Sequence, residues 1–216
     1  MSKLGKFIAF EGIDGCGKTT QFNRLVSRLI EIGVRCHATQ EPTGSPIGML
    51  IRQILRGEMQ ADERILANLF AADRANHLLN ETDGICKQVN DGVTVVTDRY
   101  YFSSYAYNGS DPETGMDLDW LISVNAMNAQ LLRPTVTVFL DITPKSAMER
   151  IKRRYLDAEH AKLELFEREE RLELVRSKYF EAFEKLKDVE NVAVIDAAAN
   201  PDIVAECVWA ELKKYF

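Results

Sequence analysis

The sequence predicts an α/β fold in which helices cover both faces of a parallel five-stranded sheet. Two observations lead to this prediction. Short apolar segments of strand length alternate along the chain with longer segments whose apolar residues recur at helical spacing. Residues suited to chemistry follow directly after several of the short segments, as ligand-binding groups do at the carboxyl ends of parallel strands. The length of 216 residues suits a single domain over residues 1–216.

Each predicted strand is a short run of apolar, mostly β-branched or aromatic residues. The first is continuously apolar and leads into a glycine-rich stretch. The second is weaker because polar residues interrupt it. The third lies between Gly92 and Asp98, the fourth follows Pro134, and the fifth precedes Asp196. In chain order, the predicted strands are residues 7–10, 34–39, 93–97, 136–140 and 192–195.

The predicted helices are segments whose apolar residues recur three and four positions apart. The first follows the glycine-rich stretch, and Gly33 is placed to end it. Pro42, Gly44 and Pro46 mark a loop before the second helix, and Pro134 stops the fourth. The first predicted helix begins near Lys18 and has its apolar stripe over residues 22–29. In chain order, the other predicted helices are residues 47–55, 64–79, 118–132, 145–156, 172–186 and 203–212.

Composition excludes several classes of protein. The net charge of -6 argues against a general affinity for nucleic acid, because phosphate backbones select basic surfaces. Neither a signal peptide nor a bilayer-spanning run is expected, so we predict no membrane association. The four cysteines are scattered, which is typical of reduced thiols in the cytoplasm, and the isolated histidines do not suggest a zinc site. These residues are Cys16, Cys36, Cys86, Cys207, His37, His77 and His160.

The glycine-rich stretch fits the pattern G-x-x-x-x-G-K-[ST] in full and predicts a P-loop NTPase-type fold. Glycines let backbone N–H groups converge on a phosphate, and the following helix points its positive end at the same anion. Lys18 is expected to reach the outer phosphates of ATP, and the Thr19 hydroxyl to ligate Mg²⁺. The expected ATP-binding residues are Gly12, Ile13, Asp14, Gly15, Cys16, Gly17, Lys18 and Thr19.

Two further patterns point to an acceptor site. Asp98 and Arg99 follow the third strand directly, where an aspartate can hold Mg²⁺ and an arginine can bridge two phosphates; the alternative is a surface salt bridge. Phe70 and Arg74 share one face of a helix, so a ring that stacks on a base would lie beside a guanidinium that hydrogen-bonds it. On spacing alone, a phenylalanine at such a position is more often a core residue.

A basic cluster precedes an acidic stretch in the last third of the chain. It consists of Arg150, Lys152, Arg153 and Arg154. Such a charge run is consistent with a solvated helix, or with a lid over about residues 150–167 whose arginines close on the transferring phosphate. Spacing does not separate the two interpretations.

Over essentially its whole length, the chain resembles the thymidylate kinase family. The resemblance rests on FIAFEGIDGCGKTTQ, LFAADRANH, TDRYYFSSYAY, VFLDITP and the closing VIDA. It implies phosphoryl transfer from ATP-Mg²⁺ to dTMP for dTTP synthesis, in a homodimer. It also implies an acceptor-binding region over about residues 40–75.

The same resemblance implies a role for each matching residue. Asp14, Asp98 and Arg99 would surround the acceptor phosphate and sugar, with Asp98 also near the metal. For dTMP, Arg52 would clamp the phosphate, and Arg99 would also contact the acceptor. Phe70 would stack on thymine, Arg74 would contact its O4, and Ser103 and Ser104 would line the base pocket. Tyr107 would lie near the sugar, where it would disfavour a ribose 2′-OH. The implied catalytic residues are Lys18, Asp14, Arg99, Arg153 and Arg150.

The P-loop lacks the arginine that some members carry, which moves the catalytic arginine to the lid, as in bacterial-type members. Two departures from the family pattern concern the lid, which is also longer than usual. The lid reads Glu164-Leu165-Phe166-Glu167, with leucine where an arginine is common. Alternative functions are a deoxynucleoside kinase, another nucleoside monophosphate kinase, or a non-catalytic regulatory ATP-binding protein. The first would need a glutamate before its arginine-serine motif, where this chain has Asp98-Arg99.

Overall fold

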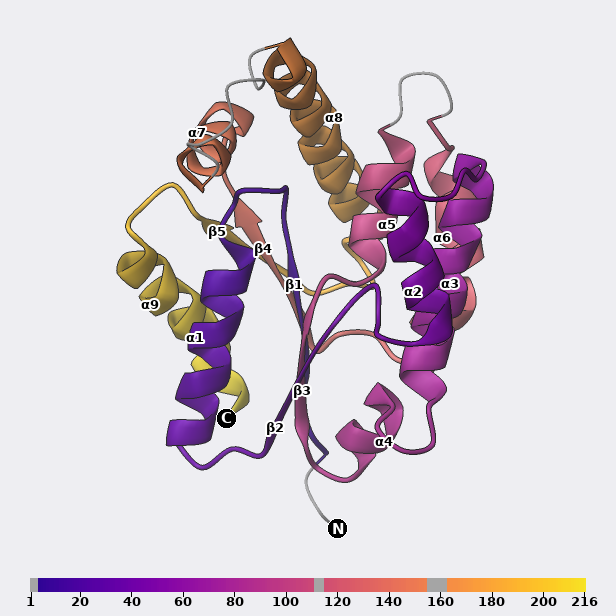
Figure 1. The fold of residues 1–216 in the computed structure, drawn as a ribbon. Helices are drawn as coiled ribbons and strands as arrows, with labels where there is room; N and C mark the ends of the chain where they lie inside the picture. The colour runs from indigo at the N-terminus through magenta and orange to yellow at the C-terminus, as the bar shows by residue number, and fades with distance from the viewer. Residues whose placement is uncertain (1–3, 111–114, 155–162) are drawn as a thin grey trace.

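The computed structural model describes residues 4–110, 115–154 and 163–216, which form a parallel sheet between layers of helices (Figure 1). The order of the strands across the sheet is β2-β3-β1-β4-β5, and each pair of neighbours is parallel. The strands are β1 (Phe7–Glu11), β2 (Cys36–Gln40), β3 (Thr94–Asp98), β4 (Val136–Asp141) and β5 (Val192–Asp196).

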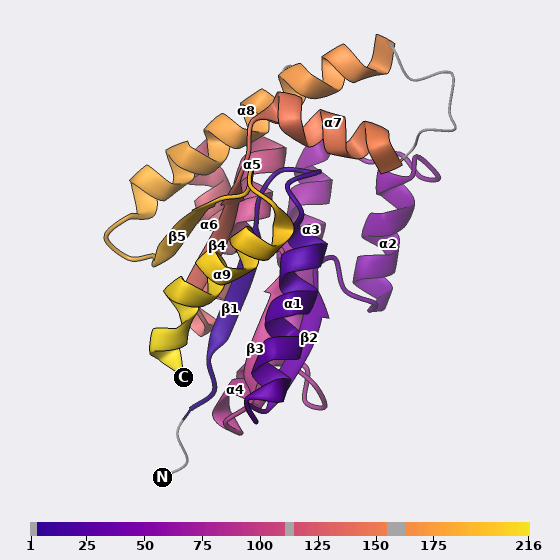
Figure 2. The same ribbon diagram turned by 90° about the vertical axis from the view of Figure 1, so that its left-hand side faces the viewer.

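Helices cover both faces of this sheet. In Figure 1, α1 and α9 lie on one side, and α2, α3, α5 and α6 lie on the other. Figure 2 shows α7 and α8 over the top, toward the carboxyl ends of the strands. None of the helices in the described segments has the length and apolar character needed to cross a bilayer. The helices are α1 (Lys18–Glu31), α2 (Pro46–Leu55), α3 (Glu63–Leu79), α4 (Ile85–Asn90), α5 (Tyr101–Gly109), α6 (Leu118–Leu131), α7 (Pro144–Arg154), α8 (Leu163–Leu186), α9 (Pro201–Leu212) and the short 3₁₀ helix η1 (Lys213–Tyr215).

The burial of each strand follows from its place in the sheet. The three central strands, β3, β1 and β4, are buried along nearly their whole length, which is why their sequences are mostly apolar and β-branched. The edge strands β2 and β5 are partly exposed. The polar residues that made β2 a weak prediction are therefore those of an edge strand.

The predicted fold class is confirmed, and all five strands lie within two residues of their expected bounds. Two helices were not predicted: α4 is short, and α5 is rich in aromatic residues that hide its period. The helix predicted over residues 172–186 is α8, which begins nine residues earlier than predicted, at Leu163. The helix expected over 145–156 is described to Arg154, and its last two expected positions lie outside the described residues.

The register of the sheet brings the distant motifs to one edge. Phe10 of β1 is paired with Asp98 of β3, and Glu11 is paired with Phe139 of β4. The P-loop, the Asp98-Arg99 pair and the end of β4 therefore leave the sheet side by side. This edge is where α/β proteins of parallel topology bind their ligands.

Candidate functional site

The loop between β1 and α1 carries the glycine-rich motif. Gly12 and Gly15 have φ angles of 146° and 83°, a backbone conformation that glycine adopts without strain. A Cβ atom on Gly15 would lie 2.5 Å from the carbonyl oxygen of Ala147, so the close approach to α7 requires glycine. No described side chain caps the start of α1 at Gly17. Its first N–H groups and the helix dipole are therefore available to an anion.

Lys18, the first residue of α1, folds back over this loop and is buried. Its Nζ donates hydrogen bonds to the carbonyl oxygens of Gly12, at 2.9 Å, and Ile13, at 3.3 Å. These carbonyls hold the ammonium group inside the curve of the loop. A phosphate bound there would meet a positive charge that is already in place.

Arg99 links the P-loop to the start of α5. Its guanidinium donates to Asp14 Oδ1 at 2.5 Å, to Ser103 Oγ at 2.9 Å and to the Tyr107 hydroxyl at 3.2 Å. It also lies over the Tyr107 ring, 4.8 Å from the centroid. Arg99 has a φ of 73°, an uncommon conformation for a residue with a side chain, and such strain is typical of functional positions.

The charges around Asp14 determine its protonation. Burial acts to raise the pKa of Asp14, but the positive charges of Arg99 and Lys18 outweigh it, so the pKa lies below its ordinary value. Asp14 is thus ionised at neutral pH and its side chain remains largely exposed. It offers a carboxylate next to Arg99 at the mouth of the site.

Glu11, the last residue of β1, is a buried carboxylate that sequence reasoning did not single out. It accepts hydrogen bonds from the backbone N–H groups of Tyr100 and Ser103, at 2.9 and 3.0 Å. It also accepts from the Ser103 hydroxyl at 2.6 Å and the Tyr179 hydroxyl at 2.8 Å. Burial raises the pKa of Glu11, although these donors and Arg99 oppose that effect. The only sequence signal was a charged residue at the end of an apolar strand.

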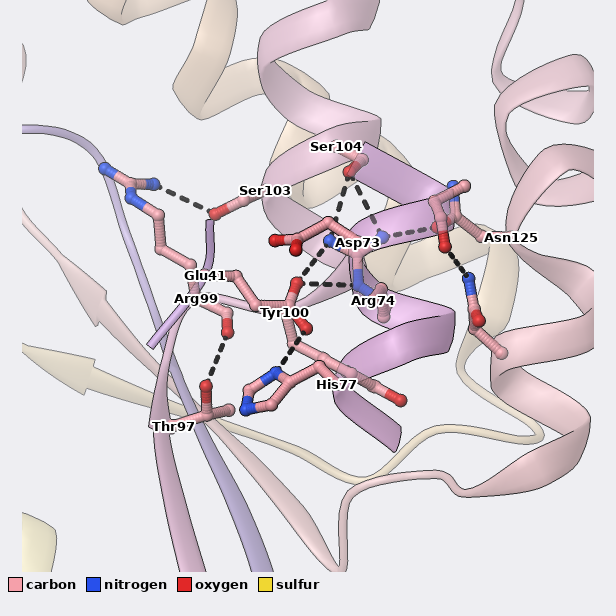
Figure 3. A network of polar contacts seen from close by, with 12 residues as sticks. Glu41, Asp73, Arg74, His77, Thr97, Arg99, Tyr100, Ser103, Ser104 and Asn125 are labelled. Atoms are coloured by element: carbon pink, nitrogen blue, oxygen red, sulfur yellow. Dashed lines mark hydrogen bonds and ion pairs between the residues drawn. The ribbon is translucent and has the colours of Figure 1, made fainter. Parts of the chain in front are cut away.

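A second polar network surrounds Arg74 of α3 (Figure 3). The Arg74 guanidinium is fully buried and pairs with Glu41, 2.8 Å from Nε and 2.7 Å from Nη2. Nη1 donates to Asn125 Oδ1 of α6. Ser104 Oγ accepts two longer bonds of 3.3 Å, from Nη1 and Nη2. The hydrogen bonds from Arg74 to Ser104 are therefore the ones that a ligand would most easily replace.

The loop after β2 is held against α3 by the residues that flank Arg74. Asp73 accepts from the backbone N–H of Thr43 at 2.7 Å and from the hydroxyls of Thr43 and Ser45 at 2.6 and 2.8 Å. His77 lies 3.2 Å from Glu41 through Nδ1 and 2.7 Å from the Thr39 hydroxyl through Nε2. These contacts fix the position of Glu41 and hence of Arg74.

The remaining residues expected at the acceptor surround this network. Phe70 is one turn before Arg74 on α3 and is partly exposed, so its ring is not closed off in the core. Arg52 of α2 donates to the carbonyl oxygen of Pro42, which places it beside the same loop. The expected pair Ser103 and Ser104 is divided: Ser103 lies with Glu11 and Arg99, and Ser104 lies with Arg74.

The basic cluster of α7 is divided as well. Arg150 donates to the carbonyl oxygen of Cys16 in the P-loop at 3.1 Å, and to that of Ala197, after β5, at 2.7 Å. It therefore spans from the P-loop to the loop before α9. Arg153 is exposed. The Arg154 side chain and most of the expected lid, including Glu164-Leu165-Phe166-Glu167, lie outside the residues whose side chains are described.

The residues expected at a metal site fit Mg²⁺ in their chemistry. Asp98 Oδ1 is buried and has no hydrogen-bond partner in the described structure, which is a costly arrangement that a cation would relieve. The Thr19 side chain is exposed at the start of α1. Both supply the oxygen ligands that Mg²⁺ prefers, and Mg²⁺ usually completes its shell with waters and phosphates. A cluster of three or more His, Cys, Asp or Glu residues is not found in the described segments.

Comparisons with known proteins agree on one family. A family described as thymidylate kinase matches residues 10–208. The chain is 36% identical over 209 residues to a probable thymidylate kinase of Pyrobaculum calidifontis, with 96% of each chain covered. It is 37% identical over 208 residues to one of Pyrococcus horikoshii, with 93% and 95% covered. It is also 36% identical over 212 residues to a thymidylate kinase of Solidesulfovibrio magneticus, with 96% and 99% covered.

Proposed function

Because the chain belongs to the thymidylate kinase family, we propose that it transfers the terminal phosphoryl group of ATP to dTMP, giving dTDP and ADP. The observation that carries this proposal is the contact between Asp14 of the P-loop and Arg99 of the Asp98-Arg99 pair after β3. It joins the P-loop to a residue just before α5, the helix whose Ser104 hydrogen-bonds to Arg74. One site thus combines a place for a donor phosphate with a place for a pyrimidine nucleotide.

On the donor side, residues 12–19 would hold the phosphates of ATP. The N–H groups of the loop and of the first turn of α1 would bind phosphate oxygens, and Lys18 would turn from its carbonyl partners toward them. Thr19 and Asp98 would hold Mg²⁺. When bound, the ion would supply positive charge to the phosphates. Arg150 would shape the region between the P-loop and residues 197–199, next to the donor phosphates.

On the acceptor side, Arg52 and Arg99 would bind the phosphate of dTMP. Phe70 would stack on thymine, and the Ser104-facing edge of Arg74 would donate to O4. A guanidinium that only donates would disfavour the 4-amino group of cytosine, because two donors would meet. Tyr107 would lie near the sugar and disfavour a 2′-OH. Ser103 would act at Arg99 rather than at the base.

Phosphoryl transfer requires positive charge around the moving group and the exclusion of water. Lys18 and Arg99 each supply one charge at the carboxyl edge of the sheet. The third would come from the lid of about residues 150–167, with Arg153 as the residue that closes on the phosphate. Asp14 would help to orient Arg99 and the acceptor.

The proposal is tested by a coupled assay of ADP release across a panel of nucleosides and nucleoside monophosphates. We expect turnover that depends on ATP, Mg²⁺ and dTMP, with dTMP preferred over UMP and CMP. Thymidine turned over faster than dTMP would identify a nucleoside kinase instead. ATP binding without any acceptor-stimulated turnover would identify a non-catalytic ATP-binding protein.

We further propose that residues 1–216 act as one kinase domain in a cytoplasmic homodimer. Exposed large apolar side chains occur on three helices, α2, α3 and α6, of which α3 contacts the other two. Apolar surface of this kind is typical of protein interfaces. The side chains concerned are Met49, Leu55, Ile65, Leu79, Trp120, Met127 and Leu131. Light scattering that gave the mass of one chain at micromolar concentration would contradict the dimer.

A further inference from the structure

We propose that Tyr179 is a positioning residue for phosphoryl transfer, which holds Arg99 in place through Glu11 and Ser103. The inference rests on the proposed function, in which Arg99 contacts the acceptor phosphate. It assigns a role in the reaction to α8, the helix that begins within the lid region and carries Tyr179 beyond it. None of the sequence motifs includes this residue.

The contacts of Tyr179 are polar at one end and apolar at the other. The side chain is fully buried, and its ring packs on Phe139, with centroids 4.8 Å apart, and on Phe183 at 5.9 Å. Its hydroxyl donates to Glu11 Oε2 at 2.8 Å and lies 3.0 Å from Ser103 Oγ. Packing in the core needs only the aromatic ring, whereas the hydroxyl contacts two polar groups, Glu11 and Ser103.

The hydroxyl meets the residues that determine where Arg99 points. Ser103 Oγ donates to Glu11 at 2.6 Å, so its lone pairs face the guanidinium, from which it accepts at 2.9 Å. Glu11 also accepts from the N–H groups of Tyr100 and Ser103, which fixes the first turn of α5 beside Arg99. A continuous chain of hydrogen bonds therefore runs from Tyr179 through Glu11 and Ser103 to Arg99.

The Glu11 carboxylate at the centre of this series of hydrogen bonds is stabilised by its donors. Glu11 is fully buried, and a buried charge is stable only when its oxygens are paired. Loss of the Tyr179 hydroxyl removes one donor from Oε2 and leaves that oxygen with Ser103 as its other donor. The Glu11 carboxylate and the Ser103 hydroxyl would then rearrange to satisfy that oxygen, and Arg99 would lose a fixed partner on the side away from Asp14.

Another tyrosine of the chain provides a matched control. Tyr101 of α5 is also buried, and its hydroxyl donates to both oxygens of the buried carboxylate of Glu190 at 2.8 Å. Glu190 pairs with Arg133 rather than with a residue of the site. Tyr101→Phe and Tyr179→Phe therefore delete the same chemical group from the same kind of partner, and only Tyr179 leads to Arg99.

The experiment is steady-state kinetics of wild type, Tyr179→Phe and Tyr101→Phe, well below the melting temperature of each. We expect Tyr179→Phe to lower kcat about tenfold, an amount equivalent to about 1.4 kcal/mol of barrier, while KM for ATP stays within about twofold. Tyr101→Phe should keep kcat within about twofold. Equal kcat in Tyr179→Phe and wild type, or an equal fall in both variants, would overturn the proposal.

A double variant tests whether Tyr179 acts through Ser103. If it does, Tyr179→Phe should lower kcat much less in a Ser103→Ala background than in wild type, because residues in one network are not additive. Independent effects that multiply would contradict the proposed route. Wild-type protein without dTMP-dependent ADP release would refute the proposed function itself and this role with it. Active wild type with unaffected Tyr179→Phe would refute only the role of Tyr179.

Discussion

The guanidinium of Arg99 and the carboxylate of Asp14 meet at 2.5 Å, across the gap between the end of β3 and the P-loop. In the proposed function, Asp14 belongs to the loop that binds the donor and Arg99 contacts the acceptor. Their contact means that neither half of the site is built independently. Arg99 and Asp14 therefore hold each other in place across the two halves of the site.

Arg99→Lys is expected to lower kcat/KM for dTMP by about 100-fold, the usual order for a donor that stabilises transition-state charge. Lysine keeps the charge but cannot contact Asp14, Ser103 and Tyr107 together, because it lacks the planar fork. Steady-state kinetics with varied dTMP would measure this. Arg133→Lys, at the ion pair with Glu190, is the control and should retain activity. Wild-type kcat/KM in Arg99→Lys would contradict the assignment.

Lys18→Ala is expected to reduce kcat by at least about 100-fold without changing the fold. The ammonium group contacts only backbone carbonyls and the Cys16 sulfur within the described residues, so few native contacts depend on it. Thermal melting and kcat should be measured on the same samples. Lys87→Ala, at a surface pair with Asp91, is the matched control. Unchanged melting together with unchanged kcat would show that Lys18 has another role.

Phe70→Ala is expected to weaken dTMP binding by about 1–3 kcal/mol, the range for a base stacked on an aromatic ring. ATP binding should hardly change, because Phe70 lies on α3 with Arg74 and not at the P-loop. Isothermal titration with each nucleotide separates the two effects. Leu79→Ala, an exposed position on the same helix, serves as the control. A loss of several kcal/mol in unfolding free energy, with both ligands weakened alike, would instead identify a core residue.

Arg153→Ala is expected to lower kcat at least about tenfold, or about 1.4 kcal/mol of barrier, with little change in KM for dTMP. Arg150→Ala should chiefly raise KM for ATP, because Arg150 contacts the carbonyl oxygens of Cys16 and Ala197. Lys152→Ala, exposed on the same helix, is the control. Wild-type kcat in Arg153→Ala would mean that the transferring phosphate meets a different cation.

Tyr101→Phe is expected to cost about 1.5–3 kcal/mol of unfolding free energy near pH 8, because a charged acceptor loses its donor. Burial raises the pKa of Glu190, while Tyr101 and Arg133 oppose that effect. The pKa of Glu190 is thus higher in the folded protein than in the unfolded protein. The stability that Glu190 contributes is therefore fully present below its unfolded-state pKa, and it is lost as the pH rises through its folded-state pKa. The cost of Tyr101→Phe should therefore shrink as the pH falls and Glu190 becomes protonated. Urea unfolding at several pH values tests this, and a cost independent of pH would contradict it.

The sequence contained enough information to predict the sheet and the P-loop. Buried parallel strands must be apolar along their length, and a phosphate loop against Ala147 must use glycine, so both leave local patterns. The sequence also predicted that the P-loop and the Asp98-Arg99 pair lie at the carboxyl ends of their strands. These features depend on residues close together in the chain or on a general rule of topology.

Other parts of the site left no such pattern. Asn125 lies 51 residues from its partner Arg74, and Tyr179 lies 168 residues from Glu11. The sequence shows only an asparagine on a helix and a tyrosine on an apolar stripe, each of which fits an ordinary packing role. Arg150 appeared to belong with Arg153, but in the structure Arg150 hydrogen-bonds to the carbonyl oxygens of Cys16 and Ala197, whereas Arg153 is exposed.

The carboxylate that caps α5 comes from far upstream in the chain. Glu11 accepts from the N–H groups of Tyr100 and Ser103, which are 89 and 92 residues away. The helix has no side-chain cap from its own N-cap residue, Tyr100. Its first turn therefore has little reason to form before β1 and β3 pair. We expect α5 to become ordered late during folding, with the acceptor half of the site completed only after the central sheet has assembled.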